Sequence, residues 1–390
     1  MSARILLAGG GTGGHLYPAL NLASALRAAR PDVELMLVGA IRGIEASVLP
    51  RAGVPYRLLP MEPFRRARLL RNWRLAASAP AVMYGMRRIF AELDPDVVVG
   101  TGGYASGPAV LYGLLSRRKT VLQEQNAFPG LVTRQLAPKV DRIFLGYPEA
   151  VEHLSPGPHT EVLAWGNPVA TPNSGGVKEA AENGFRWPAG RIAAVIGGSQ
   201  GARGLNERLL ADLQAATEWP PDMTLVWVTG PNHHAAVSSA VAGTPWADRI
   251  LTVPYVDNLG ARLSRVSLAI CRSGAMFCSE LSAAGVPAVL VPFPAAAADH
   301  QRHNAAALEA AGAAVMLEER SMQSGDLWDS VLELLREEDR LLEMAGAMSA
   351  RGRPDAADRI ARELLDLAAL TDEGELEMRV IGTGESDARG

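Results

Sequence analysis

The stretch Arg4-Ile5-Leu6-Leu7-Ala8-Gly9-Gly10-Gly11-Thr12-Gly13-Gly14-His15 joins a short apolar run to a cluster of glycines. Such a run is typical of a buried strand. Glycines that lead into a helix let the backbone approach a ligand, and the helix start offers free N–H groups to phosphate. Three more loops of this kind follow apolar runs, at residues 101–108, 196–204 and 271–275. The first half of the chain therefore carries two such loops, and the second half carries the other two. Two such half-sites favour an enzyme that joins two phosphate-bearing substrates.

Short apolar runs alternate with helical patterns along the chain, which predicts an α/β protein with parallel, doubly wound sheets. Several runs are continuously apolar, as expected of strands that helices cover on both faces. Ligands in such sheets bind at the carboxyl ends of the strands. The expected strands are residues 4–8, 33–38, 56–59, 97–100, 120–123, 142–145, 162–164, 192–196, 224–228, 250–253, 268–270, 288–291 and 314–317.

With 390 residues, the chain is long enough for two domains, each with its own core. A segment rich in Pro, Gly and Asn, residues 166–176, is the natural linker between them. We therefore expect an N-terminal domain over 1–165 and a C-terminal domain over 166–345. A helical segment over 346–370 could pack back on the N-terminal domain, although the sequence does not decide between the two domains, and a flexible acidic tail is expected over 371–390.

Composition is that of a globular protein, with 48% apolar and 21% charged residues and a mean hydropathy of +0.06. The first apolar run is too short for a signal peptide, and no run approaches the roughly 18–20 residues of a membrane span, which favours a cytoplasmic protein. Two cysteines provide no disulfide framework. Residues 1–165 carry 19 Lys and Arg against 12 Asp and Glu, whereas the remainder carries 19 against 30. The basic half is therefore expected to face an anionic partner.

A dinucleotide site is the obvious competing interpretation, because residues 9–14 also read as G-x-G-x-x-G. That motif needs an acidic residue at the end of the second strand to bind ribose. Here the second strand ends in Gly39-Ala40-Ile41-Arg42, and the acids Asp32 and Glu34 lie at its start. A nicotinamide or flavin site is therefore disfavoured.

Several polar residues are candidates for chemistry. His15 closes the first glycine loop and suits a general base, although a structural role is the alternative. Glu280, flanked by apolar residues on an expected helix, suits the two hydroxyls of a ribose, the alternative being a solvated carboxylate. Gln301 and Asn304 suit sugar hydroxyls. His300 and His303 lack an evident third ligand, so no metal site is predicted.

A basic and aromatic stretch stands out in the first half of the chain. Arginines interleaved with Phe, Leu and Trp suit an anionic membrane surface, while a solvated helix with an apolar underside is the alternative. Nucleic acid is not supported, because neither a reading motif nor a strongly basic overall charge is present. The expected membrane patch comprises Phe64, Arg65, Arg66, Arg68, Leu69, Arg71 and Trp73.

Taken together, these motifs resemble the MurG family of peptidoglycan glycosyltransferases, which is part of glycosyltransferase family 28. The resemblance covers about residues 4–368, and its segments occur in the family's order. They are Gly-Gly-Thr-Gly-Gly-His at 10–15, Thr-Gly-Gly-Tyr-Ala-Ser-Gly-Pro at 101–108, Glu-Gln-Asn at 124–126, Gly-Asn-Pro-Val at 166–169, Gly-Gly-Ser-Gln-Gly-Ala at 197–202, Cys-Arg-Ser-Gly-Ala at 271–275 with Ser279 and Glu280, and His-Gln at 300–301 with Asn304.

The resemblance implies a GT-B fold, in which two Rossmann-like domains flank a cleft. It also implies an inverting transfer without metal or cofactor, from UDP-N-acetylglucosamine to the MurNAc 4-hydroxyl of lipid I, the undecaprenyl-pyrophosphoryl-MurNAc-peptide. The product would be lipid II, made for peptidoglycan at the cytoplasmic face of the bacterial inner membrane. Other cell-wall or division proteins remain open as partners.

The resemblance also assigns roles to residues. His15 would be the catalytic base, and Asn126 would lie near the reacting sugar. The implied donor contacts are Thr12, Gly13, Gly14, His15, Asn126, Ser199, Gln200, Val256, Ala275, Glu280, His300, Gln301 and Asn304. The implied contacts of the acceptor diphosphate, in the N-terminal domain, are Gly11, Thr12, Gly13, Gly14, Gly102, Gly103, Tyr104 and Ser106.

Two positions depart from the family pattern. Ala170 stands where the family usually has arginine, a loss near the donor phosphates for which Arg203 or Arg272 could compensate. Gln123 stands where histidine is common. Alternatives are a transferase to another lipid acceptor, a UDP-N-acetylglucosamine 2-epimerase, and a weakly active cell-wall scaffold.

Overall fold

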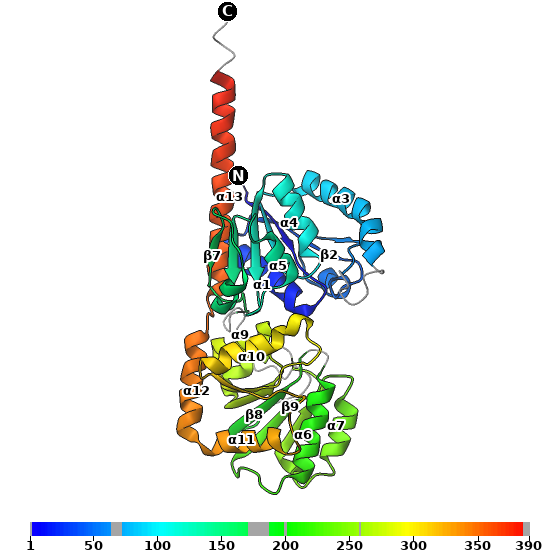
Figure 1. The fold of residues 1–390 in the computed structure, drawn as a ribbon, viewed down its shortest axis with the longest axis vertical. Coiled ribbons are helices and arrows are strands. Elements are labelled where there is room, and N and C mark those ends of the chain that lie inside the picture. Colours follow the sequence, from blue (N-terminus) through cyan, green and yellow to red (C-terminus); the bar gives the residue numbers. More distant parts are fainter. Residues whose placement is uncertain (1, 64–71, 171–186, 199–200, 257–258, 385–390) are drawn as a thin grey trace, which may run out of the picture. The chain divides into compact units, whose positions relative to one another are not determined.

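The computed structural model describes residues 2–63, 72–170, 187–198, 201–256 and 259–384, with only the backbone of 371–384. The chain forms two compact units (Figure 1). Unit 1 comprises residues 1–169 and 355–390, and unit 2 comprises residues 170–354. Each unit is a parallel sheet with helices packed on it.

The sheet of unit 1 has seven strands in the order β3-β2-β1-β4-β5-β6-β7, and all adjacent strands are parallel. Its strands are β1 (Arg4–Ala8), β2 (Glu34–Ala40), β3 (Tyr56–Leu59), β4 (Val97–Gly100), β5 (Lys119–Glu124), β6 (Arg142–Leu145) and β7 (Glu161–Leu163). Its helices are α1 (Gly13–Ala29), α2 (Glu45–Val48), η1 (Leu49–Arg51), α3 (Trp73–Leu93), α4 (Ser106–Leu115), α5 (Leu131–Leu136), η3 (Pro148–His153) and α13 (Ala356–Gly384).

The sheet of unit 2 has six parallel strands in the order β10-β9-β8-β11-β12-β13. Its strands are β8 (Arg191–Ile196), β9 (Met223–Val228), β10 (Ile250–Val253), β11 (Leu268–Cys271), β12 (Ala288–Leu290) and β13 (Ala314–Met316). Its helices are α6 (Arg203–Ala215), α7 (His234–Val241), η5 (Ala247–Arg249), α8 (Leu259–Arg262), η6 (Leu263–Arg265), α9 (Ala275–Ala284), η7 (Ala297–Asp299), α10 (His300–Ala310), α11 (Asp326–Arg336) and α12 (Glu338–Arg351).

Strand order places the four glycine loops. In unit 1, β2 and β3 are added on one side of β1, and the later strands, from β4 on, are added on its other side. In unit 2 the same change of direction lies between β8 and β11. Ligands of doubly wound sheets bind at the carboxyl ends of such strands. All four glycine-rich loops begin there, after β1, β4, β8 and β11. The predicted doubly wound class is confirmed, and the thirteen strands of the described residues are the thirteen predicted, with ends that differ by at most two residues.

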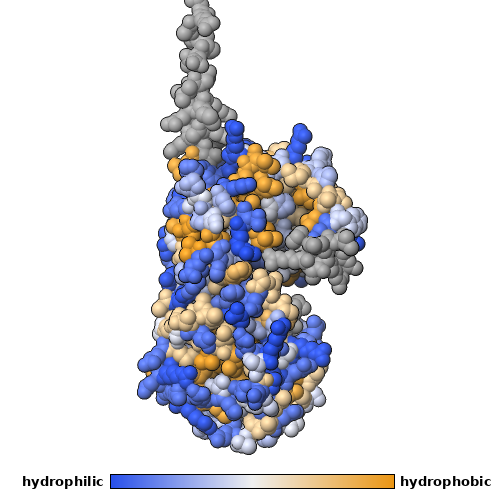
Figure 2. Space-filling model, viewed as in Figure 1, coloured by the Kyte–Doolittle hydropathy of each residue, from blue (hydrophilic) through white to orange (hydrophobic). Residues whose placement is uncertain are grey.

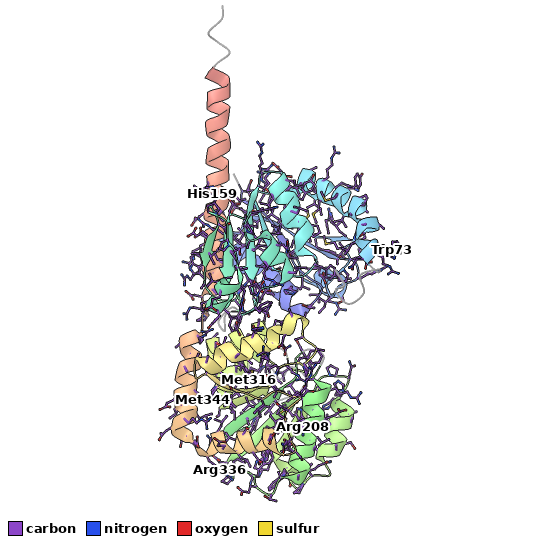
Figure 3. The ribbon with its side chains drawn as sticks, viewed as in Figure 1. Trp73, His159, Arg208, Met316, Arg336 and Met344 are labelled. Carbon is purple, nitrogen blue, oxygen red and sulfur yellow. The ribbon has the colours of Figure 1, made fainter. Side chains whose placement is uncertain are left out.

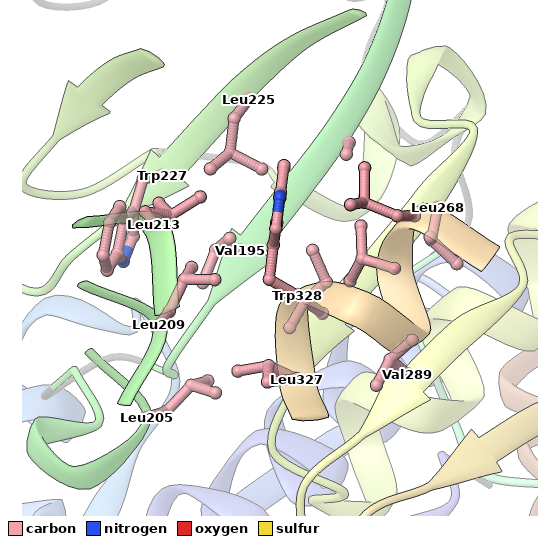
Figure 4. Packing of buried hydrophobic residues seen from close by; sticks show 14 of the residues in the cluster. Val195, Leu205, Leu209, Leu213, Leu225, Trp227, Leu268, Val289, Leu327 and Trp328 are labelled. Atoms are coloured by element: carbon pink, nitrogen blue, oxygen red, sulfur yellow. The ribbon is translucent and has the colours of Figure 1, made fainter. Parts of the chain in front are cut away.

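Apolar side chains cover both faces of the first sheet. One face packs against α1 and α13, with Leu22 and Leu364 buried there, and the other packs against α3 and α4. In unit 2, Trp227 and Trp328 lie in a single buried cluster with Val195 and Leu209 (Figure 4). Burial of a large aliphatic side chain contributes about 1.5–3 kcal/mol. These cores therefore hold the strand ends, and the loops that follow them, in fixed positions.

The C-terminal helices are divided between the two units. α12 packs on α9 in unit 2, whereas α13 packs on α1 in unit 1. In α13, Arg359 lies over the ring of Trp165, with 4.6 Å between the guanidinium carbon and the ring centroid. The helix runs to Gly384, through most of the stretch for which a flexible tail was expected, and residues 385–390 lie outside the described residues.

Candidate functional site

The loop after β1 leaves backbone donors free at the start of α1. Gly11 has a φ of +88°, and a Cβ there would lie 2.6 Å from Cε1 of Tyr104, so a larger residue does not fit. Among the described residues, the N–H groups of Thr12, Gly13 and Gly14 have no hydrogen-bond acceptor. The first turn of α1 carries no acidic side chain. Free amides and the helix dipole therefore make this end of α1 suitable for an anion.

The second loop of unit 1 lies against the first. Thr101 donates its hydroxyl to the carbonyl of His15 at 2.7 Å. A Cβ on Gly103 would lie 1.9 Å from the carbonyl oxygen of Gly10, so only glycine permits this approach. Ser106 is fully buried and donates its hydroxyl to the Gly103 carbonyl at 2.9 Å, which braces the loop at the start of α4. Two glycine loops and two helix starts thus share one corner of unit 1.

His15 lies at this corner, and a buried amide sets its tautomer. Its Nδ1 is 2.8 Å from Oε1 of Gln125. The amide nitrogen of Gln125 donates to the carbonyls of Thr101 and Gln123, each at 2.9 Å, so the amide oxygen faces the imidazole. Nδ1 of neutral His15 therefore carries the proton, and Nε2 keeps a lone pair that can accept one. The assignment follows from the hydrogen-bond network.

Further amides hold Gln125 in place. Gln123 donates its amide to Oδ1 of Asn167 at 2.9 Å, and Asn167 donates to the backbone carbonyl of Gln125 at 3.0 Å. All three side chains are almost completely buried. Gln123, at the position where the family commonly has histidine, is thus a neutral link in this network. The roles of Gln125 and Asn167 could not be read from the sequence, although both residues lie in segments that match the family pattern.

Asn126 is held by the residue that ends β5. The carboxylate of Glu124 accepts the backbone N–H of Asn126 at 3.1 Å and its side-chain amide at 3.2 Å. The other carboxylate oxygen accepts the N–H of Gly130 at 2.9 Å and the hydroxyl of Thr133 at 2.6 Å. Glu124 therefore has a clear task in fixing the loop that carries Asn126.

In unit 2, the loop after β11 is tied to α10. Ser273 donates its hydroxyl to the Gln301 carbonyl at 2.8 Å, and Asn304 donates its amide to the Ser273 carbonyl at 3.1 Å. Gln301 accepts the N–H of Phe293 at its Oε1, 2.9 Å away, which turns its NH2 group in the opposite direction. Asn304 is fully buried, so its amide supports this loop from within.

The other predicted residues of α9 and α10 lie nearby in the chain. Ala275 is the first residue of α9. His300 begins α10 and has Nδ1 2.6 Å from the carbonyl of Ala297, to which it donates. Just before it, Ala298 and Asp299 have φ values of 51° and 55°. Such left-handed conformations are strained in residues other than glycine, and strain of this kind clusters at functional sites.

Glu280 is a partly buried carboxylate on α9 with no hydrogen-bond donor among the described residues. Burial raises its pKa from 4.5 to about 7, because the charged form loses water. A carboxylate in this state lacks the donors that it needs when ionised. Two neighbouring hydroxyls of a ligand would provide them.

The two arginines that could compensate for Ala170 differ in how firmly their side chains are held. Arg272 is nearly buried, donates to the carbonyls of Val291 and Pro292 at 3.1 and 3.2 Å, and is paired with Glu319. Arg203 begins α6, directly after the glycine loop of β8, and is exposed beside Glu207. Exposed pairs of this kind are weak. Of these two arginines, Arg203 is therefore the one whose side chain is held less firmly.

The structure gives less information on the remaining predicted site residues. Val256 is buried and follows β10. Ser199 and Gln200 lie outside the described residues, as do all members of the expected membrane patch except Trp73. Trp73, at the start of α3, has 65% of its surface exposed and lies at the edge of unit 1 (Figure 3). Where the structure describes the chain, no three His, Cys, Asp or Glu side chains gather as a metal site requires.

Comparison with known proteins identifies the family. Residues 5–145 match the glycosyltransferase family 28 N-terminal domain, and residues 192–360 match the family's C-terminal domain. The UDP-N-acetylglucosamine–N-acetylmuramyl-(pentapeptide) pyrophosphoryl-undecaprenol N-acetylglucosamine transferase of Salinibacter ruber is 39% identical over 93% of this chain and 96% of its own length. The protein of the same name from Chlorobaculum parvum is 38% identical over 94% and 99%.

A solved structure agrees with these relatives. The crystal structure of Acinetobacter baumannii MurG matches with a TM-score of 0.73 and 26% identity, over 93% of this chain and 99% of that one. The two parallel-sheet α/β units are those of the GT-B fold that the family resemblance implied. The chain belongs to glycosyltransferase family 28 and, within it, to the MurG family of N-acetylglucosaminyltransferases.

Proposed function

We propose that this chain transfers N-acetylglucosamine from UDP-N-acetylglucosamine to the 4-hydroxyl of the MurNAc in lipid I, which gives lipid II. The relatives' activity is the basis for the substrates. The observation in this chain that supports the proposal most directly is the position of His15. It lies beside two helix starts, and its Nδ1 is 2.8 Å from Oε1 of Gln125. This arrangement places a proton acceptor next to a binding site for a diphosphate.

In the proposed reaction, Nε2 of His15 takes the proton of the acceptor hydroxyl as its oxygen attacks the anomeric carbon of the donor sugar. The new C–O bond forms on the face opposite the departing UDP, so the configuration inverts. The bond between the sugar and UDP breaks, and its electron pair leaves with the β-phosphate. Gln125 accepts the Nδ1–H throughout and keeps the imidazole oriented. Helix starts in unit 2 would stabilise the charge that develops on UDP.

The substrates divide between the units. The amides of Thr12, Gly13 and Gly14, with the loop of Gly102–Ser106, would bind the acceptor diphosphate in unit 1. In unit 2, Glu280 would accept the ribose hydroxyls, and Gln301 would donate to the sugar. Glu280 supports this role because it is partly buried and receives no hydrogen bond from any residue that the structure describes.

We also propose that unit 1 binds the anionic cytoplasmic surface of the bacterial inner membrane, where the lipid acceptor lies. No described helix is long and apolar enough to cross a bilayer. Support comes from exposed apolar side chains on α3 and α4: Tyr84 is 64% exposed and Leu115 66% exposed. Figure 2 shows apolar patches among polar surface in the part of unit 1 that contains these helices. Arg87 and Arg88 on α3 add positive charge.

An acceptor panel tests the proposal. The protein is incubated with labelled UDP-N-acetylglucosamine and either a lipid I analogue, a diacylglycerol or no acceptor, and products are separated. Transfer to the lipid I analogue alone is expected. Transfer to diacylglycerol, or epimerisation of the donor without acceptor, would replace the proposal with the corresponding alternative activity.

A further inference from the structure

Glu45, at the start of the short helix α2, is completely buried although the scheme above gives it no role. Its Oε1 accepts the backbone N–H of Gly11 at 2.9 Å and that of Ala40, at the end of β2, at 3.0 Å. One carboxylate oxygen therefore connects the first glycine loop to the sheet.

Glycines surround this carboxylate. A Cβ on Gly10 would lie 1.9 Å from Oε1, and a Cβ on Gly43 would lie 1.9 Å from Oε2. A Cβ on Gly39 would lie 2.7 Å from two carbons of the Glu45 side chain. Oε2 is buried and has no hydrogen-bond donor among the described residues. A buried carboxylate with one oxygen unsatisfied is unfavourable, so its presence calls for a compensating role.

The peptide between Gly10 and Gly11 transmits the effect of Glu45. Its N–H points to Glu45, while its carbonyl oxygen lies so close to Gly103 that a Cβ there would be 1.9 Å away. That same Cβ would be 3.1 Å from Cδ2 of His15. A rotation of this peptide would turn its carbonyl oxygen toward the carboxylate, where the two negative ends repel. Glu45 therefore fixes the contact between the two glycine loops and the place of the His15 ring.

The hydrogen bond from Gly11 to Glu45 also determines which backbone N–H groups of the loop are available to bind a ligand. Because Gly11 gives its N–H to Glu45, the free donors of the loop are the next three amides, from Thr12 to Gly14. The ring of Tyr104 lies over Gly11. Burial, and then the charges of Glu45 and Glu62, raise the pKa of Tyr104 above its usual value, which keeps its hydroxyl protonated as a donor.

We propose that Glu45 is a positioning residue of the acceptor site, whose carboxylate orients the Gly10–Gly11 peptide so that the two glycine loops bind the diphosphate of the acceptor. The inference rests on the proposed function, because it takes a diphosphate-linked acceptor as the ligand of unit 1.

Two variants act on the carboxylate in different ways. Glu45→Gln keeps the size and an oxygen that accepts both N–H groups, but it weakens those bonds by removing the charge. Gly43→Ala keeps Glu45 and displaces its Oε2, because the new Cβ would lie 1.9 Å from that atom. Asp212→Asn is the matched control in unit 2, where a buried carboxylate accepts the backbone N–H groups of Gly325, Leu327 and Trp328.

The primary measurement is equilibrium binding of a short-chain isoprenyl diphosphate, with UDP-N-acetylglucosamine binding and the Tm as companions. We expect Glu45→Gln and Gly43→Ala to raise the Kd for the diphosphate about tenfold, the effect of weakening one charge-assisted hydrogen bond. The Kd for UDP-N-acetylglucosamine should not change. Asp212→Asn should lower the Tm and leave the diphosphate Kd unchanged.

Two outcomes would overturn the role of Glu45. One is a diphosphate Kd within about twofold of the wild type in both variants, with only the Tm lowered, which would make Glu45 merely structural. The other is no binding of the diphosphate by the wild-type protein. A wild type that binds the diphosphate but transfers no sugar would contradict the proposed function instead, and the comparison of Kd values would still decide the role of Glu45.

Discussion

The pKa of Glu280 makes donor binding dependent on pH. Burial raises this pKa from 4.5 to about 7, so near neutrality about half of the empty protein carries a neutral carboxyl there. Ribose hydroxyls donate to the ionised form and favour it. We therefore expect the Kd for UDP-N-acetylglucosamine to be constant above about pH 8 and to rise below pH 7, with a limiting slope of about tenfold per pH unit.

The same shift predicts an effect of opposite sign on stability. Between pH 4.5 and about 7, the unfolded chain releases a proton that folded Glu280 retains. Stability that is present below pH 4.5 is thus lost as the pH rises to about 7, and the loss reaches about 3 kcal/mol for a shift of this size. Glu280→Gln should recover that stability above pH 7 while it weakens donor binding about tenfold or more, through loss of charge-assisted hydrogen bonds.

Calorimetric titration of UDP-N-acetylglucosamine from pH 5.5 to 8.5 measures the first effect, and urea unfolding at pH 4.5 and pH 8 measures the second. The sugar nucleotide is preferable to UDP, because each of its phosphates has only one acidic group, which stays ionised throughout this range, whereas the terminal phosphate of UDP titrates within it. Glu333→Gln is the control, because Glu333 is an exposed residue of α11 whose carboxylate pairs only with Arg340 of α12 among the ion pairs of the described residues. A wild-type Kd that does not change with pH, or an unchanged Kd in Glu280→Gln, would refute the assignment to the ribose.

Three further predictions concern other parts of the chain. Gln125→Leu should lower kcat about tenfold or more, because Nδ1–H of His15 loses its acceptor and the productive tautomer is no longer fixed, while the Kd for the donor stays constant in calorimetric titration. Ala298→Gly should raise the free energy of unfolding in urea by about 0.5–1 kcal/mol, since glycine adopts a φ of 51° without strain, and an unchanged or lower value would contradict this. Serine at the patch arginines should release the protein from anionic vesicles in sedimentation but spare transfer to a short-chain soluble acceptor, and undiminished vesicle binding would remove the membrane proposal. The arginines to replace are Arg65, Arg66, Arg68 and Arg71.

Local sequence patterns predicted the fold well, because strands and glycine loops are local features. Apolar runs such as 97–100 have no competing interpretation when glycines follow them and helices flank them. The place of α13 was open, because its apolar face could pack on either sheet. Its contact with α1 depends on matching surfaces, which no local pattern encodes.

Much of the site network could not be predicted, because its residues meet only through strand register. β4 and β5 are parallel with Gly100 opposite Leu122, which brings the Thr101 carbonyl level with Gln123 and within reach of Gln125. Likewise Glu45 reaches Gly11 only because β1 and β2 lie side by side. The sequence indicated which segments carry chemistry, and the register of the sheet decided which atoms meet.

The central claim is that His15 and the two glycine loops of unit 1 serve transfer to a diphosphate-linked acceptor. The most direct test is transfer of radiolabelled N-acetylglucosamine to a lipid I analogue in EDTA, by the wild type and by His15→Ala. We predict an inverted, β-linked disaccharide lipid from the wild type, and a rate lower by about 100-fold or more in His15→Ala, with a much smaller change in donor affinity. A wild type that binds the donor without forming this product, or a His15→Ala variant of equal rate, would contradict it.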